Sequence, residues 1–430
     1  MRGSFVMVGG FALTNILRLG SNLLLARLLF PEAFGLMALV TVLLIGLQMF
    51  SDIGLTPAIQ SSKRGDDPAF LNTAWTAQVL RGVFLCLVAA VLAWPMAEFY
   101  GEPILFELIL ASALSPLILG FASIRVEYAL RHMMVGRITA LELTVQTVGI
   151  SVMLALAWAT GSVWALVIGN LASSVTRVLY SWLLMPGPPG RPGFDRAAAS
   201  ELFGYGKWVF LSTIAGFFLL QSDKLILGHF LTMGDLGIYN IAFFLASFPL
   251  ILGRSMTGSL FMPVYRETPP GLSVESDRRL RRIRAGLTAM LFAFCLPLVL
   301  AGHWLVDLLY DPRYAAAGPL LILLALAQMP QLIGLTYDQA ALAGGDSRGF
   351  FLLSASRACF IVIALLLAVP AYGPQGAALA LFLAGLLSYP LQVRLALRHR
   401  AWDGLHDGVA AAILLALLLI ALILHGETLL

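Results

Sequence analysis

The chain has 430 residues, of which 60% are hydrophobic and only 12% are charged. Soluble domains carry about 25% charged residues, so this composition excludes a water-soluble globular protein and indicates a chain that crosses a membrane many times. The net charge of +4 could suggest a nucleic-acid partner. Most Lys and Arg residues, however, lie in short loops between apolar segments, where orientation in the bilayer accounts for them.

Apolar segments long enough to cross a bilayer follow one another along the whole chain. Long uninterrupted segments predict helices, because a membrane β-barrel is built from short strands of alternating polarity. At about 20 residues for each crossing, the sequence predicts an all-α polytopic membrane protein with 12 to 13 transmembrane helices. Their ranges are 5–28, 36–58, 74–95, 103–123, 139–159, 163–185, 206–228, 237–262, 284–304, 317–342, 350–370, 374–393 and 408–425.

The positive charges in the loops predict the orientation of these helices. The loops after even-numbered helices hold most of the basic residues. One of them contains Arg266, Arg278, Arg279, Arg281, Arg282 and Arg284. The loops after odd-numbered helices contain Arg313 as their only basic residue. Since cytoplasmic loops are enriched in Lys and Arg, the even-numbered loops and the N-terminus are predicted to be cytoplasmic.

A break in composition near the middle of the chain predicts a boundary between two lobes. Residues 186–193 read Pro-Gly-Pro-Pro-Gly-Arg-Pro-Gly, which cannot form a helix. The predicted organisation is an N-terminal lobe of six helices at 1–185, a cytoplasmic linker at 186–205, a C-terminal lobe of six helices at 206–400, and an additional C-terminal helix at 401–430.

The two lobes show traces of a common pattern. A shift of 202 residues places Ser21 and Asn22 over Asp223 and Lys224, on the first helix of each lobe. Because six helices return the chain to the side where it began, both lobes would start in the cytoplasm. The sequence therefore predicts a parallel duplication, with two six-helix lobes related by pseudo-two-fold symmetry.

Several stretches of the chain resemble the polysaccharide transporter family of oligosaccharide flippases, within the multidrug/oligosaccharidyl-lipid/polysaccharide (MOP) exporter superfamily. The resemblance runs in order over nearly the whole chain. The stretches are Leu24 to Met37 (LLARLLFPEAFGLM), Ser51 to Gln60 (SDIGLTPAIQ), Phe70 to Gly82 (FLNTAWTAQVLRG), Phe194 to Gly206 (FDRAAASELFGYG), Asp223 to Gly228 (DKLILG) and Leu236 to Ile241 (LGIYNI).

The resemblance implies a fold and a function. The fold is two six-helix lobes around a central cavity. The function is translocation of an undecaprenyl-pyrophosphate-linked oligosaccharide across the bacterial inner membrane by alternating access, for exopolysaccharide or O-antigen biosynthesis. The implied partners are this lipid-linked substrate, membrane lipids, and the polymerase and glycosyltransferases of the same pathway.

Charged side chains within the predicted helices are the best indicators of a site, because each costs about 2.5 to 3.5 kcal/mol at the bilayer centre. Asn15, Arg18 and Asn22 share one face of the first helix. Basic residues outnumber the acids in these segments, which predicts a basic cavity, and guanidinium pairs well with phosphate. The predicted substrate-binding residues are Arg18, Asn15, Asn22, Arg81, Arg177, Lys224, Arg254 and Arg357.

Local pairing is the alternative interpretation of these residues. Each cation could pair with a nearby acid, and Lys224 could pair with Asp223 or with a neighbouring helix. Arg81 and Arg357, near the cytoplasmic ends of their helices, could instead snorkel to the interface. Asp223 is also the candidate for coupling transport to a proton or cation, since buried carboxylates serve as relay groups. The sequence predicts no cofactor and no metal site, because Cys86, Cys295 and Cys359 lie far apart in apolar segments and are interpreted as core residues.

Two other functions compete with the transport of lipid-linked oligosaccharide. A membrane glycosyltransferase or polymerase would need catalytic carboxylates in a sizeable outer loop, and the predicted outer loops are short and contain no DxD or ExD motif. A drug or cation antiporter of the same superfamily has a compatible fold, but its cavity should be acidic.

Overall fold

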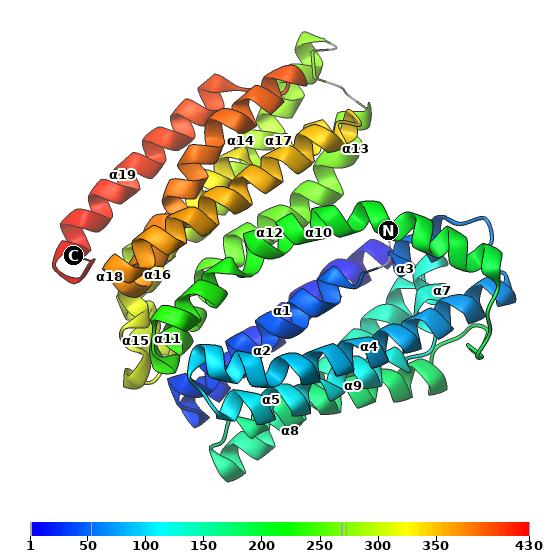
Figure 1. The fold of residues 1–430 in the computed structure, drawn as a ribbon. Coiled ribbons are helices and arrows are strands. Elements are labelled where there is room, and N and C mark those ends of the chain that lie inside the picture. Colours follow the sequence, from blue (N-terminus) through cyan, green and yellow to red (C-terminus); the bar gives the residue numbers. More distant parts are fainter. Residues whose placement is uncertain (1, 53, 268–269, 272, 430) are drawn as a thin grey trace. The chain divides into compact units, whose positions relative to one another are not determined.

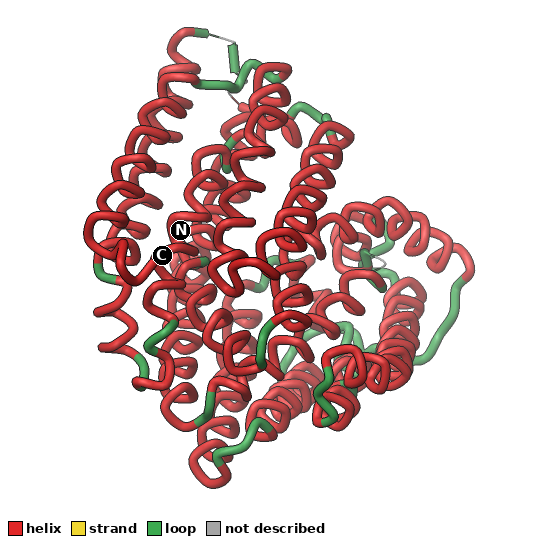
Figure 2. Tube along the Cα trace, turned by 60° about the vertical axis from the view of Figure 1, so that its left-hand side comes forward, coloured by secondary structure: helices red, strands yellow, loops and turns green. Residues whose placement is uncertain are grey.

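The computed structural model of the chain describes residues 2–52, 54–267, 270–271 and 273–429. Within these ranges helices are the only extended regular elements and no β-strand occurs, which confirms the all-α prediction (Figure 2). The chain divides into two compact units, Met1–Phe217 (unit 1) and Phe218–Leu430 (unit 2). Among the described residues, seven helices are long and apolar enough to cross a membrane, or nine if each of two bent pairs is one span.

In unit 1, α8 packs against α1 and α9, and α4 packs against α5 and α6 (Figure 1). Each predicted segment of the first six is helical for most of its length. The helices are α1 (Arg2–Leu28), α2 (Pro31–Phe50), α3 (Leu55–Ser61), α4 (Pro68–Tyr100), α5 (Ile104–Ser112), α6 (Leu114–Gly120), α7 (Arg125–Arg131), α8 (Val135–Thr160), α9 (Trp164–Leu183) and α10 (Arg196–Phe230), the last of which continues into unit 2.

Unit 2 is arranged around α16, which contacts α11, α14, α18 and α19 and is almost entirely buried. Its helices are α11 (Met233–Ala246), α12 (Phe248–Met256), the π-helical η1 (Thr257–Phe261), α13 (Met262–Glu267), α14 (Val274–Leu300), α15 (Gly302–Leu309), the 3-10 helix η2 (Pro312–Tyr314), α16 (Ala317–Gly334), α17 (Tyr337–Ala343), α18 (Ser347–Arg398) and α19 (Gly404–Leu429).

The second helix is shorter than the sequence predicts. The apolar segment 36–58 predicts one helix, but α2 ends at Phe50 and a separate short helix, α3, begins at Leu55. The Asp52 carboxylate accepts a hydrogen bond from the Gly54 amide at 2.9 Å, and Gly54 has a positive φ of 66°. This local turn replaces the helical hydrogen bonds, so the predicted end of the helix at residue 58 was wrong.

The long helix α18 contains the break that the sequence predicts between residues 370 and 374. Gly373 has non-helical angles, with φ at 57° and ψ at −136°, and divides α18 into two helical parts. A residue with a Cβ atom would be strained at this positive φ, and Pro370 and Pro374 beside it cannot donate backbone hydrogen bonds.

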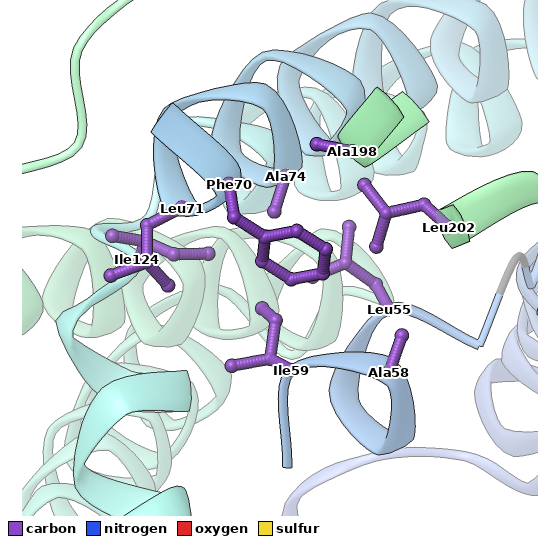
Figure 3. Packing of buried hydrophobic residues seen from close by; sticks show 9 residues of the cluster. All are labelled: Leu55, Ala58, Ile59, Phe70, Leu71, Ala74, Ile124, Ala198 and Leu202. Atoms are coloured by element: carbon purple, nitrogen blue, oxygen red, sulfur yellow. The ribbon is translucent and has the colours of Figure 1, made fainter. Parts of the chain in front are cut away.

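The end of unit 1 that contains the start of α10 is held by a small apolar core (Figure 3). Phe70 of α4 is fully buried, and Leu55 and Ile59 of α3 pack around its ring, as do Ala198 and Leu202 of α10. Burying such side chains stabilises a fold by about 1.5 to 3 kcal/mol each. The first turns of α10 are therefore fixed on α3 and α4.

Of the predicted linker 186–205, residues 186–195 form an ordered strap on α4, and residues 196–205 are the first turns of α10. The amides of Arg191, Gly193 and Asp195 donate hydrogen bonds to side chains of α4, at 2.9 to 3.0 Å. The sequence places the lobe boundary in this segment, whereas the two compact units divide further along, within α10. The strap itself is part of unit 1.

An ion-pair cluster fastens the end of the strap. Arg64 binds the carboxylate of Asp195 at 2.7 Å and that of Asp67 at 2.8 Å. The hydrogen bond from Arg64 lowers the pKa of Asp195 and of Asp67 below the ordinary value, and in turn raises the pKa of Arg64. All three side chains are about one-third exposed, so solvent screens the pair and its main effect is to fix the geometry.

Candidate functional site

Unit 1 contains a polar cavity of about 440 Å³ between α2, α4, α6, α7 and α9, hereafter the unit 1 cavity. This volume falls within the range of about 300 to 1,000 Å³ that small-molecule sites occupy. Its charged and amide side chains are Gln48 and Asp52 at the end of α2, Gln78 and Arg81 of α4, Glu127 of α7 and Arg177 of α9.

Arg81 is half-buried in the wall of this cavity. Its Nε donates to the Ser51 hydroxyl at 2.9 Å, and its Nη2 donates to the Gln48 carbonyl at 2.6 Å. These two bonds hold the guanidinium at the end of α2. In the part of the chain that the structure describes, no carboxylate lies within ion-pair distance of Arg81, so its charge can serve an anionic ligand.

Two carboxylates also line the unit 1 cavity. Asp52 is half-buried and is held by the Gly54 amide. Glu127 Oε2 is buried and has no hydrogen-bond partner among the described residues. The basic side chains of the cavity are those of Arg81 and Arg177, so it has equal numbers of acidic and basic side chains. This cavity therefore has no basic excess, and the basic central cavity that the sequence predicts stays a prediction.

Arg177 is paired locally, as the alternative interpretation of the sequence proposed. Its Nη2 donates to Glu142 Oε2 at 2.5 Å, and the Arg177 side chain is 29% exposed. Arg177 also borders a second cavity of about 280 Å³ whose polar lining is mostly serine, with Asn170. Because Glu142 neutralises its charge, Arg177 is less available to a ligand than Arg81.

The bend between α6 and α7 shapes the cavity. Helices α5 and α6 together meet α7 at 62°. The Gln78 amide donates to the carbonyls of Gly120 and Ala122 at 3.1 and 3.0 Å, and the Trp75 indole also donates to Ala122. These bonds satisfy carbonyls left free where α6 ends. Gly82 lets α4 approach, since a Cβ atom there would lie 3.0 Å from Gly120 Cα.

A smaller pocket in unit 2 contains two of the predicted residues. Arg357 binds the Asp338 carboxylate through two nitrogens, at 2.8 and 3.2 Å, and Gln392 donates to the same carboxylate. Arg254 lines the pocket without an ion pair to any carboxylate in the described ranges. The pocket has a volume of only about 60 Å³, which is too small for a ligand site of the usual size.

The three predicted residues of α1 lie outside these cavities. Arg18 is exposed, and it forms no ion pair with any carboxylate that the structure describes. Asn15 and Asn22 are half-buried on the same helix. Helix α1 packs on α8, where the Gln146 amide donates to the Thr14 carbonyl at 2.9 Å.

Asp223 and Lys224 do not pair with each other in the described structure. The buried Asp223 carboxylate accepts a hydrogen bond from the Tyr239 hydroxyl at 2.9 Å. Lys224 lies 3.4 Å from the Gln221 side-chain oxygen and 5.7 Å from the centre of the Phe243 ring. The suggested ion pair between the two residues is therefore wrong.

The sequence analysis missed a buried polar network in unit 2. It assigned Arg284 to a cytoplasmic loop, yet this side chain is 3% exposed. Arg284 donates to Tyr265, Thr336 and the Ala401 carbonyl. In the first turn of α19, the Asp407 carboxylate accepts hydrogen bonds from four side chains, those of Tyr337, Tyr389, Trp402 and His406. The signal that the sequence offered for this network was two acids, Asp403 and Asp407, at the start of the apolar helix α19.

Metal ligands are not gathered anywhere in the described ranges, where no group of three or more His, Cys, Asp or Glu side chains could hold an ion. Of the cysteines, Cys295 is buried and Cys86 is half-buried. Cys359 is exposed on α18, so its interpretation as a core residue was wrong.

Comparison with known proteins supports the resemblance that the sequence shows. The family model described as "Polysaccharide biosynthesis protein" matches residues 24–317. The succinoglycan biosynthesis transport protein ExoT of Rhizobium meliloti (strain 1021) is 25% identical over 313 residues, which are 71% of this chain and 61% of ExoT. The amylovoran biosynthesis protein AmsL of Erwinia amylovora is 24% identical over 302 residues, 68% of this chain and 76% of AmsL. The chain thus matches about three fifths of the length of ExoT.

Solved structures share the fold at low identity. The lipid II flippase MurJ in an inward closed conformation has a TM-score of 0.69 and 12% identity, covering 98% of this chain and 99% of that one. An inward-facing multidrug resistance MATE family transporter of the MOP superfamily has a TM-score of 0.60 and 14% identity, covering 94% and 95%. The chain therefore shares the all-helical fold of these transporters, as the sequence predicts.

Proposed function

The chain belongs to the polysaccharide biosynthesis protein family, and we propose that it is a flippase that carries an undecaprenyl-pyrophosphate-linked oligosaccharide across the bacterial inner membrane by alternating access. Its membership in a family with transport proteins for surface polysaccharides supports this proposal, as does the MOP fold. The positive charge of the even-numbered loops supports a cytoplasmic N-terminus. The protein is proposed to transport its substrate without chemical change, and so not to be an enzyme.

One observation supports a particular residue as the substrate contact. Arg81 lines a ligand-sized polar cavity and has no ion-pair partner among the described carboxylates. A guanidinium can bind two phosphate oxygens at once, and partial burial strengthens such a bond. Hydroxyl and amide groups of the cavity walls suit a saccharide. Arg81 is therefore proposed as the main phosphate ligand of unit 1, and Arg177 as a weaker one because of Glu142.

The remaining candidates keep the roles that the sequence assigns to them. Arg18, with Asn15 and Asn22, and Arg254 and Lys224 are proposed as further contacts for the anionic head group during transport. Arg357 is proposed for the same role, but as a weaker contact because its ion pair with Asp338 neutralises its charge. The buried Asp223 is proposed as the group that couples transport to a proton or cation.

An antiporter for cationic compounds is the second candidate function. The carboxylates of Asp52 and Glu127 in the unit 1 cavity favour it, because a cationic ligand would satisfy the free oxygen of Glu127. The two functions differ in which residue matters most. Removing Arg81 should abolish binding of an anionic substrate, whereas removing Glu127 should abolish binding of a cationic one.

The test is complementation of a strain that lacks the chain and has lost its surface polysaccharide. Arg81→Ala is expected to reduce polymer by about tenfold or more, the effect of losing about 1.4 kcal/mol of binding, at an unchanged membrane level of the protein. Arg81→Lys should recover only part of this, because ammonium lacks the planar fork. Arg348→Ala, an exposed arginine outside the cavities, is the matched control.

Two results would contradict the proposed function. Normal polymer in the strain without the chain would exclude a role in its transport. Increased sensitivity of that strain to cationic drugs, reversed by the normal chain and not by Glu127→Gln, would favour the antiporter instead. Neighbouring glycosyltransferase and polymerase genes would independently support the flippase.

A further inference from the structure

Another hollow of unit 1 meets the unit 1 cavity at Arg81, and its lining is mostly apolar. It has a volume of about 380 Å³ and lies between α4, the strap and the first turns of α10; we refer to it as the α4–α10 groove. Apart from Arg81 and three hydroxyl groups, its lining is apolar. Arg81 lines both hollows, so one guanidinium marks the junction of a polar cavity and an apolar groove.

The floor of the groove is one stripe along α4. The residues that face it are three or four positions apart, the spacing that brings side chains to one face of a helix. Leu80 and Phe84 in this stripe are 64% and 58% exposed. Leu80 directly precedes Arg81 in the sequence, Phe84 follows it by three residues, and all three line the groove. The apolar surface therefore begins beside the charged group and extends away from it.

The strap supplies the opposite wall in a fixed position. The amides on either side of Phe194 are bound, with Gly193 donating to Thr76 and Asp195 donating to Thr73. Each threonine hydroxyl also donates to a carbonyl of its own helix, so both of its roles are used. Phe194 is 78% exposed despite this fixed backbone, and its ring lines the groove.

The third wall is equally rigid. Leu202 of α10 is 1% exposed and belongs to the apolar core around Phe70 (Figure 3), and Ala199 beside it also lines the groove. The ion pair between Arg64 and Asp195 fixes the start of the same helix. The groove is thus formed before any ligand binds, which lowers the entropic cost of ordering a flexible chain in it.

We propose that the α4–α10 groove binds the isoprenoid chain of the polyprenyl-pyrophosphate carrier close to its head group, with the pyrophosphate on Arg81 and the saccharide towards the unit 1 cavity. This inference rests on the proposed function. A lipid-linked oligosaccharide combines an apolar chain, an anionic group and a polar glycan in this order, and the groove, Arg81 and the cavity follow in the same order. An ordinary phospholipid matches only the first two.

The test is photolabelling of the full-length protein in phosphatidylcholine nanodiscs. The probe is a polyprenyl pyrophosphate with a diazirine on the isoprene unit nearest the pyrophosphate. Labelled peptides are identified by mass spectrometry, and are expected in residues 73–84 and 194–202. Excess unmodified polyprenyl pyrophosphate should reduce the labelling by about tenfold or more, equivalent to occupying most sites. Phosphatidylglycerol and inorganic pyrophosphate at the same concentration should have little effect.

Two variants of similar chemistry separate the groove from the rest of the lipid-exposed surface. Leu80→Trp fills the groove, and Leu87→Trp places the same ring on α4 at a residue that is 61% exposed and outside the groove. Labelling should fall by about tenfold in Leu80→Trp and stay unchanged in Leu87→Trp. Arg81→Gln should also reduce it, because the head group loses its charged contact.

Each other outcome overturns a distinct part of the reasoning. Competed labelling on other helices, with none in the groove, refutes this inference and leaves the proposed function in place. Equal competition by phosphatidylglycerol identifies an ordinary lipid site, and equal competition by inorganic pyrophosphate means that the apolar chain contributes nothing; either refutes the inference. Labelling that polyprenyl pyrophosphate does not compete anywhere on the chain refutes the inference and the proposed function together.

Discussion

Replacing Arg284 tests whether a residue of an arginine-rich loop is a structural element of unit 2. Its side chain is 3% exposed and donates three hydrogen bonds, to Tyr265, Thr336 and the Ala401 carbonyl, at 2.9 to 3.0 Å. Its guanidinium also lies 4.5 Å from the centre of the Tyr337 ring. Arg284→Met keeps much of the volume and removes the charge and every donor.

The expected loss can be worked from the partners that remain. Asp403 is 6% exposed and lies 3.8 Å from Arg284, so the variant leaves a carboxylate with reduced compensation. Removing one member of a buried ion pair costs about 3 to 5 kcal/mol. Arg281 stays 3.4 Å from Asp403, but its side chain is 60% exposed. This favours the lower end, about 3 kcal/mol.

The assay is the temperature at which half of the detergent-solubilised protein is lost from its size-exclusion peak. For a domain of this size, 1 kcal/mol shifts the midpoint by about 2 to 4 °C, so about 3 kcal/mol corresponds to about 6 to 12 °C. All variants need one heating protocol, because unfolding of such proteins is irreversible. Arg282→Met, an exposed arginine two residues away, is the control and should change the midpoint little.

A second change distinguishes a lost charge pair from a simple packing defect. Asp403→Asn in the Arg284→Met background removes the carboxylate that was left behind and should restore part of the stability. Equal midpoints for Arg284→Met and Arg282→Met would refute the structural role of Arg284. Failure of Asp403→Asn to restore any stability would refute the charge argument.

Three further predictions concern the strap, the packing of α8 and the topology. The ion pair with Arg64 lowers the pKa of Asp195 below 3.8, so the stability that the pair gives the strap is complete above that pH and is lost as the pH falls through the lowered pKa. Hydrogen-exchange protection of residues 191–195 should therefore be constant from pH 8 to pH 5 and decrease only below about pH 4. Asp195→Asn should abolish this decrease in protection. Gly149→Val should reduce the amount of folded protein far more than Gly136→Val, because a Cβ atom at Gly149 would lie 1.8 Å from a side-chain oxygen of α9 and one at Gly136 would meet no atom within 4 Å; similar yields from both would show that α9 adjusts freely. In a cysteine-free background, a cysteine at position 278 should react with an impermeant reagent only from the cytoplasm and one at position 311 only from outside, and the reverse pattern would overturn the orientation.

Hydropathy predicted the helices of this chain well because the bilayer imposes their length. Each predicted apolar segment is helical over most of its length, and Gly373 breaks α18 in the predicted gap between two segments. The ends were less predictable. Asp52 and Gly54 end α2 early through one local hydrogen bond, and hydropathy averaged over a window cannot detect a single contact of this kind.

The candidate site was predictable only where a charge interrupts an apolar helix. Arg81 met that criterion and lines the unit 1 cavity. Glu127 did not, because it lies in the short helix α7, whose sequence has the polarity of a loop. Arg284 likewise lies in a stretch with the polarity of a loop, and its partner carboxylate, Asp403, follows more than a hundred residues later. Such long-range pairs depend on the tertiary fold and leave no trace in the local composition.

The pattern of hydrogen bonds along the strap sets which substitutions evolution can accept there. Only alternate amides are used, those of residues 191, 193 and 195, and the atoms that receive them belong to α4. Pro192 occupies a position between them, where a missing N–H costs nothing. Homologous straps should therefore tolerate proline at 192, and should keep glycine at 190, where a Cβ atom would lie 2.8 Å from the Trp75 ring. They should exclude proline at the odd-numbered positions, where it would detach the segment from the helix beneath.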